Sequence, residues 1–403
     1  MSCHHAVYQW TRTITPHFPH LSKPQATVLA LWSLGMVVAR SCALSAVSTF
    51  LGQWLDRTPN TVRQQLREFC DEAGAKRGVH RQEVVVETCF VPLLTWVVSG
   101  WEGQQLARAL DATTLGQRFV VVALSVLYRG GAIPVAWTVL PAGEKHAWRR
   151  EWLRMLRQVR AAVPHRFFVL VLADRGLYAR WLFRRVVRLG WHPLLRSNGG
   201  GSVRPAPRAR YQPLRSFVPQ PGPEWAGTGT AFVGPRRRLN CTLLARWEEG
   251  YADPWLLLTD LAPSAGDACW YGLRAWIEQG FTITKRAGWQ WQRTRMTDPE
   301  RAARLWLAVA VATLWLLSVG GAAEETVPVG TLPTLPANPP LPRQRQATRL
   351  RLVSIFRQGW QYILVALLHH RRLPIGRFVP EPWPSVELLE PKLRVIHEVP
   401  LAA

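Results

Sequence analysis

In the first hundred residues, apolar positions recur at helical spacing and are separated by short polar turns. Apolar side chains that recur every three to four residues line one face of a helix, so this pattern predicts helices rather than strands. Between two of them, Asp56-Arg57-Thr58-Pro59-Asn60 predicts a turn followed by a helix cap. The predicted helices cover residues 24–38, 43–55, 61–69 and 82–101. Residues 1–100 are therefore expected to form a helical N-terminal domain.

From residue 105 the apolar pattern changes to that of strands. Unbroken apolar runs of this length predict buried strands, and Arg129-Gly130-Gly131 predicts a hairpin turn between the second and third of them. The predicted strands are 107–112, 119–128, 133–140, 167–173 and 192–196, and the helices between them are 146–163 and 177–189. Three antiparallel strands followed by helix, strand, helix and strand is the order of a ribonuclease-H-like fold, so the predicted class is α/β.

A segment rich in glycine, proline and arginine interrupts this order at residues 198–234, which predicts a loop or an insertion. Two further strands are predicted on either side of Glu248-Glu249-Gly250, at 239–247 and 255–261. Together these segments predict a β insertion at about 198–265. Helical character returns near residue 267, and the whole core is expected to span 105–320.

Residues 305–319 are almost wholly apolar, after a helix start at Thr297-Asp298-Pro299-Glu300 and before an expected end at Gly320-Gly321. A helix of about 21 residues is long enough to span a membrane. It also fits a helix buried inside an α/β core, and the sequence has no second span, so we expect a buried helix and no membrane partner. Beyond it, residues 327–343 predict a proline-rich linker and 344–403 a tail containing one helix.

The composition is that of a folded, strongly basic protein. Hydrophobic residues make up 48% of the 403 residues, and the formal net charge is +24, almost all of it from arginine. A bias toward arginine codons would explain arginine in place of lysine, but it would not explain the shortage of acids. A field of this sign attracts polyanions, and nucleic acid is the expected partner.

The six cysteines are scattered along the chain, and none forms a Cys-x2-Cys pair. This distribution predicts free, mostly buried thiols in a reducing cytosol. The N-terminus does not have the pattern of a signal peptide, because polar residues and histidines precede any apolar run. We therefore expect a cytoplasmic protein associated with the nucleoid.

The short basic helix at 61–69 resembles the second helix of a helix-turn-helix motif. Arg63, Gln64 and Arg67 would lie on its outer face and are candidates for contact with DNA. The same residues would also suit an ordinary solvated helix face, and the sequence does not separate the two interpretations.

Two aspartates follow long apolar runs: Asp111 in Leu110-Asp111-Ala112 and Asp174 after Val169-Leu170-Val171-Leu172-Ala173. Taken singly, Asp111 could be a cap at a strand end, and Asp174 could pair with Arg175. A third acid, Glu278, lies in a motif of its own, and this motif favours the interpretation that the three acids form one site. Three carboxylates that converge on one point can hold two divalent metal ions, which is the arrangement used for phosphodiester cleavage.

The motif consists of Tyr271, Arg274, Glu278 and Lys285, separated by three, four and seven residues. On a regular α-helix this spacing places all four side chains along one stripe. The stripe suits a metal-bound phosphodiester, with Glu278 on the metal, the two cations on phosphates and the Tyr271 phenol donating a hydrogen bond.

With these residues the sequence resembles the DDE transposases of bacterial insertion sequences, whose signature is Tyr-x2-Arg-x3-Glu-x6-Lys. The resemblance covers about 105–320 and includes Asp-Arg-Gly-Leu-Tyr at 174–178; Trp276 lies one place later than the usual tryptophan of the family. It implies a ribonuclease-H-like core in which the first aspartate ends the first strand, the second ends the fourth, and the glutamate lies on a helix after a β insertion.

The resemblance implies that Asp111, Asp174 and Glu278 are catalytic and hold two Mg²⁺ or Mn²⁺ ions. The implied reaction is cleavage at the ends of the element, followed by transfer of the freed 3′-OH into target DNA. We expect a homodimer in the active complex. Some family members flip a base onto a tryptophan of the insertion, for which Trp247 and Trp255 are candidates, although packing would explain either one.

Two alternatives remain open at the level of the sequence. One is a nuclease on the same fold that does not join strands. The other is an inactive or domesticated DNA-binding protein, against which the intact acids and Lys285 argue.

Overall fold

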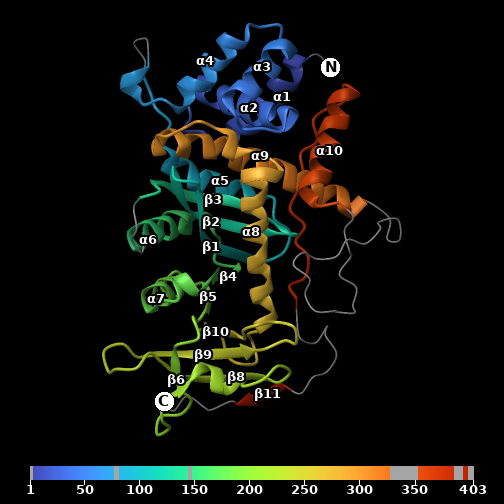
Figure 1. Cartoon of the computed structure of the whole chain (residues 1–403). Coiled ribbons are helices and arrows are strands. Elements are labelled where there is room, and N and C mark those ends of the chain that lie inside the picture. Colours follow the sequence, from blue (N-terminus) through green and yellow to red (C-terminus); the bar gives the residue numbers. More distant parts are fainter. Residues whose placement is uncertain (1–2, 77–80, 144–147, 327–352, 385–393, 398–403) are drawn as a thin grey trace.

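One mixed sheet runs through the molecule, and helices cover both of its faces (Figure 1). The computed structural model describes residues 3–76, 81–143, 148–326, 353–384 and 394–397. The strands are β1 Gln105–Leu115, β2 Phe119–Tyr128, β3 Gly131–Pro141, β4 Phe168–Ala173, β5 His192–Arg196, β6 Ser202–Arg204, β7 Gln212–Pro213, β8 Glu224–Ala231, β9 Leu239–Arg246, β10 Trp255–Thr259 and β11 Arg394–His397. The α-helices are α1 Cys3–Ile14, α2 Lys23–Ala39, α3 Leu44–Trp54, α4 Pro59–Cys70, α5 Phe90–Ser99, α6 Arg149–Gln158, α7 Arg180–Arg188, α8 Ala275–Thr282, α9 Pro299–Thr326 and α10 Ile355–Leu368.

The strand order begins β3-β2-β1-β4-β5. β1 is antiparallel to β2 and parallel to β4, and β5 is parallel to β4. The expected succession along the chain, three antiparallel strands and then helix, strand, helix and strand, is present, and the mixed α/β class is confirmed. The hairpin between β2 and β3 turns at Arg129 and Gly130, both of which have positive φ, as a two-residue hairpin turn requires.

The sheet continues beyond β5 as β10-β9-β8-β6-β7, with β11 paired to β8. The predicted strands β9 and β10 are present. The segment 198–234, predicted as a loop or an insertion, contains β8, an eight-residue strand that was not predicted and that pairs along its whole length with β9. The tail is likewise not only helical, since β11 adds a parallel strand to β8. The linker expected at 327–343 lies outside the described residues.

The N-terminal part is helical, as its periodicity predicts, and α4 is capped by the Thr58 side chain, which accepts a hydrogen bond from the Thr61 backbone N–H. The helix expected at 82–101 is shorter: a 3₁₀ turn at Val86–Cys89 leads into α5. Pro92 explains this start, because a proline has no backbone N–H and fits only in the first turn of a helix. The cysteines that the structure describes as free are all buried, namely Cys42, Cys70, Cys89, Cys241 and Cys269.

The apolar segment forms α9, which packs against α2, α10 and β3. It is long and apolar enough to cross a membrane, but 94% of its most apolar stretch is buried inside the protein. The expectation of a buried core helix is confirmed. The predicted end at Gly320-Gly321 was wrong, because α9 continues to Thr326. These glycines serve close packing instead: a Cβ at Gly320 would lie 2.0 Å from the Ile355 carbonyl oxygen of α10.

The crossing of α9 and α10 gives a prediction about stability. A Cβ added to Gly359 would lie 1.9 Å from the carbonyl oxygen of Leu316, which is backbone and cannot move aside. Gly359→Ala should therefore destabilise the protein by about 1–3 kcal/mol, although alanine normally favours a helix. Urea denaturation measures the effect. Gly74→Ala is the matched control, because nothing lies within 4 Å of its added Cβ; equal stabilities of the two variants would contradict the crossing.

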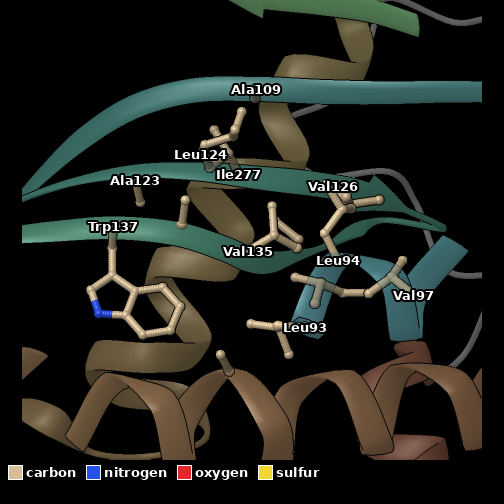
Figure 2. Close-up of a cluster of buried hydrophobic side chains, with 14 of the residues drawn as sticks. Leu93, Leu94, Val97, Ala109, Ala123, Leu124, Val126, Val135, Trp137 and Ile277 are labelled. Carbon is tan, nitrogen blue, oxygen red and sulfur yellow. The ribbon is translucent and has the colours of Figure 1, made fainter. Parts of the chain in front are cut away.

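A buried cluster fixes the position of α8 against the sheet. Figure 2 shows Ile277 of α8 with Ala109 and Ala123 of β1 and β2 among its members. Gly280 allows close approach, because an added Cβ there would lie 2.8 Å from the Cβ of Ala132. Small side chains at these positions let α8 lie directly on the sheet, and this brings the motif helix to the strands that hold the two aspartates.

Candidate active site

The pairing of β1 with β4 places two aspartates side by side. The two strands run parallel, and their last paired residues are Leu110 and Ala173. Asp111 and Asp174 follow directly, so both carboxylates start from neighbouring positions where the parallel pairing stops. Asp174 follows the end of β4, as expected. Asp111 does not end its strand, because β1 continues to Leu115 with β2 alone as its partner.

Asp111 projects from the sheet face that α8 covers. It is paired with Ala123, and directly paired residues of antiparallel strands point to the same side. The carboxylate of Asp111 is thereby directed toward Arg274 and Glu278 at the start of α8.

The motif segment is not the single regular helix that the spacing suggests. Ala268–Arg274 is a 3₁₀ helix, Ala275–Thr282 is α8, and Ile283–Ala287 is a π-helix. A change of helix type changes the rotation per residue, so the spacing of the motif alone does not fix the directions of its four side chains. Single π-helical turns inside α-helices are rare and occur often at functional sites, and here one contains Lys285.

Arg274 connects the three acids. Its Nη2 lies 2.8 Å from Asp111 Oδ2 and 3.5 Å from Asp174 Oδ2, and its Nη1 lies 2.5 Å from Glu278 Oε1. The side chain of Arg274 is 12% exposed, whereas that of Glu278 is 60% exposed. The acids therefore converge on one point, as predicted, and the point is open to solvent on the Glu278 side. The role expected for Arg274, on phosphates, stays a prediction.

Burial sets the electrostatics of the site. It raises the pKa of Asp111 to about 6, against the opposing effects of the Arg274 charge and the hydrogen bond from the Ala112 backbone N–H. Burial lowers the pKa of Arg274, but the opposing effect of Asp111, Tyr271, Glu278 and Asp174 is larger. The net result is a pKa above the ordinary value for arginine. The arginine is thus a permanent cation among carboxylates, one of which is held in an environment of low polarity.

Tyr271 and Lys285 occupy different environments. Tyr271 is 5% exposed, and its ring packs against Trp255 at 5.4 Å and under the guanidinium of Arg196 at 5.8 Å. Tyr271 is therefore part of the core, although the motif spacing predicts a phenol that donates a hydrogen bond to a phosphodiester. Burial raises the pKa of Tyr271 to about 12. Lys285 is half-buried; burial and Arg286 lower its pKa, and the negative charge of Asp111 opposes them. Lys285 therefore lies within electrostatic reach of the acids.

The donor set suits a hard divalent cation, because Mg²⁺ and Mn²⁺ prefer carboxylate oxygens. The three carboxylates already surround a cationic group, which shows that the place favours positive charge. Among the residues that the structure describes, however, no group of three His, Cys, Asp or Glu side chains lies close enough together to hold a metal as it stands. The Arg274 guanidinium lies between the acids, so metal binding requires it to withdraw.

A second ionic cluster, which sequence reasoning missed, anchors the loop after Asp174. Arg175 Nη2 lies 2.9 Å from Asp253 Oδ2, and Arg215 binds the other oxygen of the same carboxylate. Contacts with both arginines lower the pKa of Asp253. The available signal was the scarcity of aspartate in this basic chain. Because aspartates are few, Asp253 between β9 and β10 could have been singled out as a residue with a specific partner. The cluster ties the Asp174 loop to the predicted β insertion.

The remaining predicted residues are three side chains of α4 and two tryptophans of the predicted insertion. Arg63, Gln64 and Arg67 are exposed on α4, in the helical part at the far end of the molecule from β8 (Figure 1). Trp247 is half-buried, and its indole N–H donates a hydrogen bond to the Tyr251 carbonyl oxygen. Trp255 is the candidate nearer the site, since it packs against Tyr271.

The fold and the three acids define a class of protein. In this class, two aspartates follow the paired stretch of two parallel strands, and a glutamate lies on a helix that covers the same sheet. The family described as "Transposase DDE domain" matches residues 104–315, which is just over half of the chain and includes all three acids. The chain belongs to this family.

Two further comparisons add little. A solved structure, "Cryo-EM structure of piggyBac transposase synaptic complex with hairpin DNA (SNHP)", is similar over 77% of this chain and 72% of that one. Its TM-score of 0.40 and identity of 10% are too low to support an argument. A search of curated proteins found no match.

Proposed function

We propose that this protein is a DNA transposase that cleaves DNA at the ends of an insertion sequence and joins the freed 3′-OH to target DNA. The observation that supports this most directly is the convergence of Asp111, Asp174 and Glu278 on Arg274 in a member of the transposase DDE domain family. The bacterial origin implied by the Tyr-x2-Arg-x3-Glu-x6-Lys signature belongs to the same proposal.

The three acids have the role of holding two Mg²⁺ or Mn²⁺ ions. When bound, such ions supply activation of water and stabilisation of the leaving 3′ oxygen. Asp111 is the most buried of the three acids, with a side chain 15% exposed, and it keeps its position through the hydrogen bond from Ala112. Asp174 and Glu278 are more exposed and face the side from which a DNA strand can approach.

The two cations of the motif have the role of holding phosphates. Arg274 presents a planar fork that suits a phosphate oxygen pair, once it has exchanged its carboxylate partners for the substrate. Lys285 is the second phosphate ligand, since the described residues offer no carboxylate within ion-pair distance of its ammonium group. Tyr271, being buried, positions Arg196 and Trp255 rather than contacting DNA directly.

The domain organisation is part of the proposal. Residues 105–320 form a ribonuclease-H-like core, which the order β3-β2-β1-β4-β5 supports. The β insertion at about 198–265 extends the same sheet, and residues 1–100 form a DNA-binding domain in which α3 and α4 resemble a helix-turn-helix. The active complex is proposed to be a homodimer in the cytoplasm, on nucleoid DNA.

A cleavage assay tests the function against its alternatives. The substrate is a labelled duplex that carries one of the inverted repeats bracketing the gene, incubated with Mg²⁺ and a plasmid target. A transposase gives cleavage at the repeat and products joined to the plasmid. Cleavage without joined products would favour a nuclease on the same fold, and binding without cleavage would favour a domesticated DNA-binding protein.

A further inference from the structure

Helices α6 and α7 lie on the sheet face opposite to α8 (Figure 1), and both are rich in arginine; some of these arginines form a basic surface with a nearby turn. It consists of Arg157 of α6, the arginines of α7 and the turn 236–238 between β8 and β9, which is Arg-Arg-Arg. We call this surface the α7 arginine face; its α7 members are Arg180, Arg184, Arg185 and Arg188. None of these residues belongs to the acid site or to the motif that defines it.

Hydrogen bonds hold the parts of this face together. Arg180 Nη1 donates to the Arg236 carbonyl oxygen at 2.5 Å, and Arg184 Nη2 donates to the Arg238 carbonyl oxygen at 3.4 Å. Because α7 bonds to the backbone of the turn, the three arginines of the turn are fixed beside those of the helix. The surface is therefore built by two segments far apart in the sequence.

The positive charge of this face is not neutralised from within. In the part of the chain that the structure describes, no ion pair joins any of its arginines to a carboxylate. Burial lowers the pKa of Arg185, and so do the charges of Arg157 and Arg188. Like charges held this close are unfavourable unless an anion joins them.

We propose that the α7 arginine face binds the phosphate backbone of double-stranded DNA outside the cleavage site. The inference rests on the proposed function and adds a second contact surface to it. A nine-residue helix is about 14 Å long, and over that length one DNA strand carries about four phosphates, as many as α7 has arginines. Guanidinium groups bind phosphate oxygens in pairs, which suits such a row.

A lipid surface fits this face less well. Membrane-surface helices insert apolar side chains beside their basic ones. Of the apolar residues of α7, Leu182, Phe183 and Val186 are buried and not free to insert. Trp181 is half-buried, and Val187 is exposed. The face therefore offers charge and hydrogen-bond donors to a polyanion and little apolar area to a bilayer.

The face also begins at the edge of the sheet where the acids lie. Asp174 is separated from the first residue of α7 by five residues, and the guanidinium of Arg149, at the start of α6, lies 5.6 Å from the ring centre of Trp181 in α7. Both helices therefore begin at the carboxyl edge of β4 and run away from it. DNA held at the acid site on the α8 side would reach the start of α7 by crossing this edge.

The test compares two triple variants that remove the same charge. R157Q/R185Q/R188Q changes the face, and R357Q/R371Q/R372Q changes exposed arginines on and after α10. Binding of a labelled duplex of random sequence is measured over a range of salt concentrations. The face variant should bind about tenfold or more weakly, and its log–log salt slope should be shallower by about two to three, since each phosphate contact contributes about 0.9.

The control variant should keep the wild-type slope, and both variants should keep the wild-type melting temperature. Equal weakening in the two variants would overturn the proposal, because net charge alone would then explain binding; so would an unchanged face variant. Metal-dependent cleavage by the face variant at saturating DNA should persist, which separates this surface from the acid site. A wild-type protein that does not bind duplex DNA would instead contradict the proposed function itself.

Discussion

Asp174→Asn is expected to abolish metal-dependent DNA cleavage, with a loss of about a thousandfold or more, while the protein remains folded and still binds DNA. Asparagine keeps the oxygen that accepts the hydrogen bond from the Gly176 backbone N–H, so the 3₁₀ turn after β4 should survive. What is lost is one negative charge beside Asp111 and one oxygen ligand for a divalent ion. Asp111→Asn and Glu278→Gln should have the same effect for the same reason.

Strand cleavage with Mg²⁺, measured alongside a gel shift, checks this result. Asp260→Asn is the matched control, because this exposed aspartate lies just after β10 and contacts His192 rather than the acid site. It should cleave like the wild type. An Asp174→Asn protein that cleaves at the wild-type rate would remove Asp174 from the catalytic set.

Arg274→Ala should have two opposite effects. In the structure its guanidinium shares the three carboxylates that a metal ion would need, so the two cations compete for the same oxygens. Hydrogen bonds to charged groups contribute about 1.5–3 kcal/mol, so the variant should bind Mn²⁺ about tenfold or more tightly in the absence of DNA. Cleavage should nevertheless fall by about a hundredfold, because a phosphate ligand is lost.

Lys285→Ala is the comparison variant, because it removes a cation of the motif that does not compete with a metal ion for the carboxylates. The negative charge of Asp111 opposes the lowering of the Lys285 pKa by burial and Arg286, but among the described residues no ion pair joins the Lys285 ammonium group to a carboxylate. Its removal should therefore weaken cleavage and leave Mn²⁺ binding, measured by titration calorimetry, near the wild-type value. If Arg274 and Lys285 were both only phosphate ligands on one stripe, as the spacing suggests, metal binding should be unchanged in Arg274→Ala and in Lys285→Ala. Equal Mn²⁺ affinities would support that stripe and contradict competition at Arg274.

Much of the fold was predictable because it follows from local patterns. β2 matches its predicted bounds, and α2 and α3 match theirs within a residue or so, since unbroken apolar runs and helical spacing are local signals. β8 was missed because its sequence contains Gly227 and Gly229, which favour loops. Its glycines are explained only by neighbours: a Cβ at Gly229 would lie 2.9 Å from the Arg204 carbonyl oxygen of β6.

The acids and their convergence were predictable, but the contacts of Arg274 with them were not. Asp111 and Asp174 stand out because each follows an apolar run, and parallel pairing of the two strands then brings them together. The contact of Arg274 with both depends on where α8 lies on the sheet and on the change from 3₁₀ to α-helix at Arg274 itself. Residue spacing assumes one helix type throughout, so it could not give these distances.

The continuous sheet has a mechanical consequence. β4 is bonded to β5, β5 to β10, and β10 to β9, so the hairpin of β8 and β9 is joined to Asp174 by successive ladders of backbone hydrogen bonds. Asp253 adds a direct ionic tie between the same two regions. A force exerted on the hairpin by bent DNA would thus reach the acid site through a stiff path rather than be absorbed by a flexible joint. Lengthening the turn between β9 and β10 should make that path more flexible. DNA bound at the hairpin would then no longer affect the relative positions of the acids.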